Sequence, residues 1–137
     1  MKELMQSNIY DCDEKIIVVG CCLKDMQPKA YKQLEKLKLP IFAICLEQIH
    51  INMAITKILG MIRAKNIKEI IFATVDRSPH CIQLHYIQDE VTKLGFNVKF
   101  TNYVAVNDSL IEVSNETISL SKNLSLLKNI AENKSAN

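Results

Sequence analysis

Glycine is scarce in this chain of 137 residues, which contains only Gly20, Gly60 and Gly95. A dinucleotide-binding fingerprint and a Walker-type loop both need clustered glycines, because the backbone must approach a phosphate closely. Gly20, in GCCLKD near the end of a predicted strand, has no second glycine close behind it. The sequence therefore excludes both phosphate-binding motifs.

Arginine and long apolar runs are also scarce. Only Arg63 and Arg77 stand among the 17 basic residues, and the net charge is +2, so we expect no nucleic-acid partner. The longest apolar run, IIVVGCCL at 16–23, is too short to span a bilayer. The first residues, MKELMQSNIYDCDEK, lack the apolar centre of a signal peptide. We therefore expect a cytoplasmic protein with no membrane partner.

The chain has five cysteines, an odd number, and two of them are adjacent. A secreted disulfide framework favours even counts, so we expect reduced thiols. The sequence contains no C-x-x-C pair of the thioredoxin kind and no close run of cysteines typical of ferredoxin-like clusters. A thiol site in this protein would have to combine cysteines from separate loops.

Apolar runs alternate with helical patterns along the chain. Buried strands are predicted at 15–22, 40–47 and 68–76, and a fourth strand, nearer an edge, at 97–106; helices are predicted at 27–39, 51–65 and 78–94. This alternation is typical of an α/β domain with a parallel sheet between two helical layers. We predict a three-layer Rossmann-like or flavodoxin-like domain with four parallel strands in the order 2-1-3-4.

The C-terminal part has a different pattern. LIEVSNETISLS, at 110–121, places two short apolar stretches around a polar SNET and predicts a hairpin. A short helix follows, with Leu124, Leu127 and Ile130 predicted to face inward. We expect one domain over residues 1–137, with frayed ends at 1–13 and 132–137.

The helix at 51–65 carries more apolar residues than the cover of one sheet face requires. Met53 and Met61 widen its apolar stripe, leaving a narrow polar face. Either the sheet side of this helix is simply broad, or a partner, such as a second copy of the chain, covers part of it.

Most of the cysteines and histidines follow the predicted strands. In parallel α/β sheets, ligands bind beyond the carboxyl ends of the strands. Gly20, Cys21 and Cys22 end the first strand, and Cys45, Glu47 and His50 end or follow the second. The residues after the third strand are Asp76, Arg77, Ser78, His80 and Cys81, with His85 one helical turn later. The predicted strand order brings these groups to one crevice, whereas Cys12 should lie at the opposite end.

Two residues of the third loop are candidate catalytic groups. With Ser78 as N-cap and Pro79 at the first helical position, Cys81 falls in the first turn of the 78–94 helix. The helix dipole there should lower the pKa of the Cys81 thiol. His85, four residues later, should lie on the same helix face at an exposed position.

We interpret the chain as a small redox or metal-handling protein. Cys81 and His85 are its candidate catalytic residues, and Gly20, Asp76 and Ser78 its candidate cofactor contacts. Zinc or iron would suit the mixed ligands, which are Cys21, Cys22, Cys45, His80, Cys81 and His85. One alternative is a non-catalytic interaction subunit that uses the 51–65 helix. The other is a small-ligand enzyme that holds an anion at the 76–81 turn.

Overall fold

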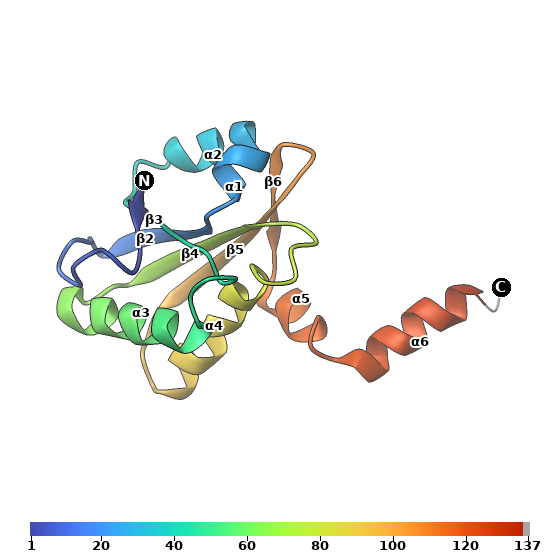
Figure 1. The fold of residues 1–137 in the computed structure, drawn as a ribbon. Coiled ribbons are helices and arrows are strands. Elements are labelled where there is room, and N and C mark those ends of the chain that lie inside the picture. Colours follow the sequence, from blue (N-terminus) through green and yellow to red (C-terminus); the bar gives the residue numbers. More distant parts are fainter. Residues whose placement is uncertain (136–137) are drawn as a thin grey trace.

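The computed structural model describes residues 1–135, and a mixed sheet lies at the centre of this part of the chain (Figure 1). Its six strands are β1 (Lys2–Glu3), β2 (Lys15–Gly20), β3 (Ile41–Ile44), β4 (Glu69–Val75), β5 (Lys99–Val106) and β6 (Ser109–Val113). They lie in the order β1-β3-β2-β4-β5-β6, and only β6 runs antiparallel to its neighbour.

The predicted α/β class and the order of the four predicted strands are confirmed, because β3, β2, β4 and β5 are adjacent in that order. The prediction of a four-stranded parallel sheet is wrong. β1 adds a parallel strand beside β3, and β6 adds an antiparallel strand beside β5. β1 is only two residues long, too short to show strand periodicity. β5 is consequently an inner strand.

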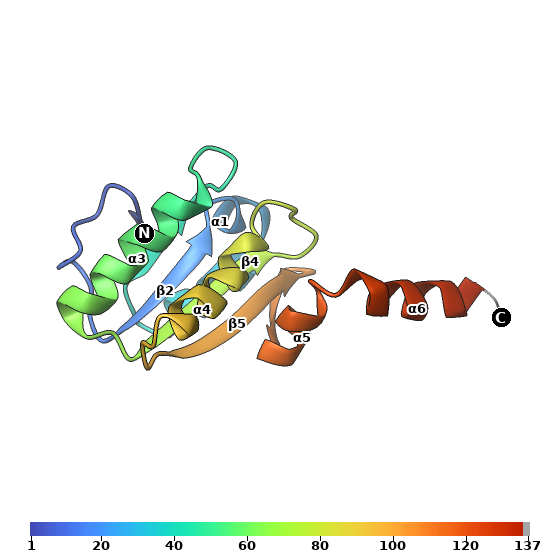
Figure 2. The same ribbon diagram turned by 90° about the horizontal axis from the view of Figure 1, so that it is seen from below.

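Helices cover both faces of the sheet, as Figures 1 and 2 show. The helices are α1 (Leu23–Met26), α2 (Pro28–Glu35), α3 (Ile51–Lys65), α4 (Gln83–Lys93), α5 (Asn115–Leu120) and α6 (Leu124–Ser135). Successive strand residues face opposite layers. Ile16 and Val18 of β2 join the core under α3 and α4, whereas Ile17 and Val19 join the core under α1 and α2. Two separate cores therefore hold the sheet between its helical layers.

The first thirteen residues are packed and not frayed, which corrects the sequence-based prediction. Leu4 is fully buried, and its backbone N–H donates to the carbonyl oxygen of Ala43. Ile9 packs against α3, where its Cγ2 lies 3.1 Å from the position that a β-carbon on Gly60 would occupy. The N-terminal segment therefore covers part of the broad apolar surface of α3. Met53 of α3 remains 55% exposed, and a partner on this helix stays a prediction.

The C-terminal part differs from the prediction in two ways. Residues 110–121 do not form a hairpin by themselves, because 109–113 pair with β5 and 115–120 form α5. The Ser114 side chain accepts a hydrogen bond from the Thr117 N–H and so caps α5. Helix α6 projects away from the sheet (Figure 2). Its predicted inward residues are not buried: Leu124 is 78% exposed, Ile130 is exposed and Leu127 is half-buried.

Residues 132–135 belong to α6, and the remainder of the predicted frayed end, 136–137, lies outside the described residues. Within residues 1–135, no helix combines the length and apolar character that crossing a bilayer requires. Residence in the cytoplasm stays a prediction.

Candidate functional site

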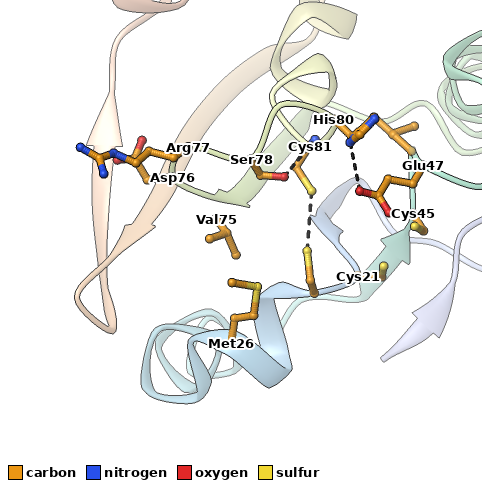
Figure 3. Close-up of a pocket in the computed structure, with 12 residues that line it drawn as sticks. Cys21, Met26, Cys45, Glu47, Val75, Asp76, Arg77, Ser78, His80 and Cys81 are labelled. Atoms are coloured by element: carbon orange, nitrogen blue, oxygen red, sulfur yellow. Dashed lines mark hydrogen bonds and ion pairs between the residues drawn. The ribbon is translucent and has the colours of Figure 1, made fainter.

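A cavity of about 580 Å³ lies beyond the carboxyl ends of β2, β3 and β4 (Figure 3). The cysteines and the loop residues predicted to meet at this edge contribute to its wall. They are Cys21, Cys22, Cys45, Glu47, Asp76, Arg77, Ser78, His80 and Cys81, joined by Met26, Leu46 and Val75. The topology rule for parallel sheets thus located the cavity from the sequence alone.

Two backbone features place Cys81 over the end of β2. After β4, Arg77 takes a left-handed conformation (φ 68°), and the chain turns back. A β-carbon on Gly20 would lie only 2.7 Å from the Cys81 Sγ, so the thiol rests directly against the Gly20 backbone. Of the three glycines, Gly20 is therefore the one that shapes the cavity.

Helix α4 begins later than the sequence predicted, at Gln83 rather than after Ser78. The Ser78 Oγ still accepts a hydrogen bond from the Cys81 N–H, at 3.4 Å, but it does so within an irregular turn over 78–82. Cys81 therefore precedes the helix and lacks the first-turn position on which its predicted low pKa depended.

Four thiols lie in this cavity. The Sγ atoms of Cys22 and Cys81 are 3.8 Å apart, and either can donate a hydrogen bond to the other. Burial, and then hydrogen bonding to Cys45, raises the pKa of the Cys21 thiol from 9.0 to about 12. Burial also raises the pKa of the Cys81 thiol, against the opposing effect of the Ser78 hydrogen bond. The predicted lowering of the Cys81 pKa is wrong, because desolvation disfavours the thiolate.

A polar pair joins the loops that follow β3 and β4. The His80 Nδ1 lies 3.1 Å from the Glu47 Oε1, with both side chains largely exposed. An exposed pair of this kind contributes little to stability, and both of its side chains line the cavity. His50, the other imidazole near β3, accepts a hydrogen bond from the Asn52 N–H and caps α3. His50 does not line the cavity.

A comparison with protein families agrees with this architecture. A family model described as a Rossmann-like domain matches residues 12–137. The chain belongs to this Rossmann-like family. No curated protein and no solved structure gave a match. The family establishes the fold of this Rossmann-like domain, whereas its chemistry has to be inferred from the site itself.

His85 of this Rossmann-like domain does not join the thiols. It is buried, 1% exposed, and lines a second cavity between β4, β5, α4 and α5. Its Nε2 lies 2.7 Å from the Thr74 Oγ1, and its Nδ1 lies 2.9 Å from the Asn102 Oδ1. The predicted exposed position and the predicted pairing of His85 with Cys81 are therefore wrong.

Sequence reasoning missed the partners of His85. Thr74 and Asn102 lie inside predicted strands, and the apolar pattern of those strands indicates a core and no polar site. A signal was present, because asparagine is depleted in strands and Asn102 falls between β-branched and aromatic residues. Asn102 also donates to the Gln88 Oε1 at 3.0 Å and to the Asn115 Oδ1 at 3.2 Å. The asparagine within the strand was therefore the sequence signal for this buried hydrogen-bond network.

The predicted six-residue metal set is not assembled. Within residues 1–135, no group of three or more histidine, cysteine or acidic side chains is arranged to hold a metal ion. Four of the cysteines line the first cavity together with His80, which pairs with Glu47, whereas His85 belongs to the second cavity.

The protonated thiols should make the domain less stable at alkaline pH. The unfolded chain releases its thiol protons above about pH 9, whereas folded Cys21, with its pKa of about 12, keeps its proton. The folded state then binds more protons than the unfolded state, so stability falls as pH rises from about 9 towards 12. We expect Cys21→Ala to reduce this loss, measured by urea denaturation at about pH 8 and about pH 10. Equal losses in both proteins would contradict the expectation.

Proposed function

We propose that this protein is a thiol-redox protein in which Cys22 and Cys81 alternate between two thiols and an internal disulfide. The separation of 3.8 Å between their Sγ atoms carries the proposal. A disulfide bond is about 2.05 Å long, so closing it requires the two sulfurs to approach by roughly 1.8 Å. Disulfide formation therefore requires side-chain rotations that bring the two sulfurs together by this amount.

The surroundings assign different tasks to the two thiols. Cys81 is buried and its thiol has a raised pKa, so it is a poor nucleophile at neutral pH. Cys22 is only half-buried, and it lies on the wall of the 580 Å³ cavity. We therefore assign the first attack to Cys22 and the second to Cys81.

The reaction partner is a disulfide, either of a small thiol compound or of another protein. The Cys22 thiolate attacks one sulfur of that disulfide, the S–S bond breaks, and one thiol leaves. Cys81 then loses its proton and attacks the Cys22 sulfur of the mixed disulfide, releasing the second thiol. The two cysteines supply the two electrons that reduce the external disulfide. The raised pKa of Cys81 makes the second step slow at neutral pH.

Single serine variants test this order of events. After incubation with oxidised glutathione, peptide mapping of the unaltered protein should show a Cys22–Cys81 disulfide. Cys81→Ser should accumulate glutathione on Cys22, because the second attack is lost. Cys22→Ser should form neither product. The matched control is Cys12→Ser, since Cys12 is buried near the other end of β2, and it should still form the disulfide. Five free thiols in the treated unaltered protein, or a disulfide between other cysteines, would overturn the proposal.

A soft metal ion is the second candidate for the same thiols. In a tetrahedral site with metal–sulfur bonds of about 2.3 Å, adjacent sulfurs are about 3.8 Å apart, which equals the Cys22–Cys81 separation. Completing the site would require Cys21 and Cys45 to move, because no three ligands are already arranged within residues 1–135. Metal analysis of protein purified without oxygen separates the candidates, since bound zinc or iron with four unreactive thiols favours this second one.

A further inference from the structure

A hydroxyl group and an imidazole line the second cavity, which is about 360 Å³ in volume, and a buried amide is hydrogen-bonded to the imidazole behind them. Thr74 comes from β4, His85 from α4 and Asn102 from β5, and all three side chains are at least 98% buried. Thr74 and His85 line the cavity itself. We propose that these three residues form a second reactive site, in which Thr74 accepts an acyl group from a small activated ester.

The hydrogen bonds assign the protons of this group. Asn102 donates through its Nδ2 to Gln88 and Asn115, so its Oδ1 is the acceptor that faces His85. The His85 Nδ1 must then carry a proton and donate it to that oxygen. The Nε2 consequently has its lone pair free, and the Thr74 hydroxyl donates to it at 2.7 Å.

This arrangement is that of an activated nucleophile. A base within hydrogen-bond reach of a hydroxyl, itself oriented by a third group, is the pattern shared by unrelated acyl-transfer enzymes. Burial lowers the pKa of His85, which keeps the imidazole neutral and able to accept a proton at neutral pH. Asn102 acts as a positioning residue, because it holds the imidazole in the required tautomer.

The lining of the cavity defines the acyl compound. Val75, Ile82, Val104, Val113 and Ile118 provide apolar walls, and a volume of about 360 Å³ admits a small molecule. A short or aromatic acyl chain fits these walls, with its carbonyl carbon directed to Thr74. Asp76 and Arg77 both line the cavity, and of the two the Arg77 guanidinium is the group that would favour the negative charge developing on the carbonyl oxygen.

The proposed reaction proceeds in two steps. The Thr74 oxygen attacks the carbonyl carbon while its proton moves to the His85 Nε2. The bond from carbon to the leaving oxygen then breaks, and that oxygen takes the proton. Water next attacks the acyl-Thr74 ester, giving its proton to His85, which returns it to the threonine oxygen. The products are the free acid and the alcohol, and no further reactant is needed.

4-Nitrophenyl acetate is the probe for this site, with peptide mapping as the readout that distinguishes threonine from cysteine. We expect an acetyl group on Thr74. Thr74→Val should abolish acetylation at position 74, because valine has no hydroxyl oxygen to attack the ester. Thr74→Ser should restore it. The matched control is Thr117→Val, because Thr117 lines the same cavity from α5 and has no contact with His85 among the described hydrogen bonds.

The acetylation rate should also depend on pH in the way that His85 requires. Because its pKa is lowered, the rate should already be constant at neutral pH and fall only in more acidic solution. A mapped wild-type protein that carries acetyl groups on cysteine and none on Thr74 would overturn the proposal, even if Thr74→Val failed to fold. This site does not depend on the thiol pair, so Cys22→Ser and Cys81→Ser should both retain acetylation at Thr74.

Discussion

Replacing His85 with alanine should destabilise the protein by about 3 kcal/mol. The change leaves Thr74 and Asn102 without the partner that each has in a buried setting, and an unsatisfied buried polar group costs about 1–3 kcal/mol. It also opens a space beside Phe72, whose ring meets the imidazole edge-on with centroids 6.3 Å apart. Urea denaturation followed by circular dichroism measures the loss, a suitable method because the chain has no tryptophan.

His80→Ala is the matched control for this prediction. Its side chain is 48% exposed and paired only with an exposed carboxylate, so its loss should change stability by about 0.5 kcal/mol or less. The opposite ranking of the two histidine variants would mean that the buried network does not support the fold. The sequence predicted an exposed His85, whose replacement would change stability little. Because the structure buries His85, we now expect a large loss of stability.

Replacing Gly20 with valine should both destabilise the protein and prevent the Cys22–Cys81 disulfide. The new β-carbon would lie 2.7 Å from the Cys81 Sγ and 3.4 Å from its Cβ, so the thiol must move. Forcing extra carbons into a packed interior costs about 1–3 kcal/mol. Moving the Cys81 sulfur also breaks its contact with Cys22. Denaturation measures the first effect, and peptide mapping after oxidised glutathione measures the second.

The control for Gly20→Val is a glycine substitution far from the thiols. Gly60 lies in α3, and Gly60→Ala places a β-carbon 3.1 Å from the Ile9 Cγ2. Alanine is more favourable than glycine within a helix by about 1 kcal/mol. This variant should form the disulfide as the unaltered protein does. A Gly20→Val protein that oxidises at the normal rate would show that Cys22 and Cys81 do not need their present geometry.

The sequence predicted the central fold because its signals there are local and repeated. Continuous β-branched runs predicted β2, β3 and β4 within a few residues, and helix α3 begins and ends at the predicted positions, Ile51 and Lys65. The two outer strands, β1 and β6, were not predicted, for two different reasons. β1 is too short for a pattern, and β6 is recognisable only through its pairing with β5. Long-range pairing of this kind leaves no periodic signal in a single chain.

The site was predicted in part for a related reason. Topology alone brings the ends of β2, β3 and β4 together, so Cys21, Cys22, Cys45 and Cys81 could be placed at one edge. The direction of each side chain depends on where a helix begins. A shift of the start of α4 from residue 79 to Gln83 removed Cys81 from the helix and left His85 facing the sheet. The pKa of the Cys81 thiol was therefore predicted wrongly as well, because it depends on burial, and the spacing of residues does not reveal burial.

The turn between β5 and β6 provides the cap for a helix that lies far earlier in the chain. Helix α2 has no side-chain cap of its own at Gln27. The backbone N–H groups of Lys29 and Ala30 donate instead to the carboxylate of Asp108, 79 and 78 residues further along. Gln27 in turn accepts from the Asp108 N–H. During synthesis on the ribosome, the amino end of α2 therefore stays uncapped until Asp108, in the turn before β6, has been made.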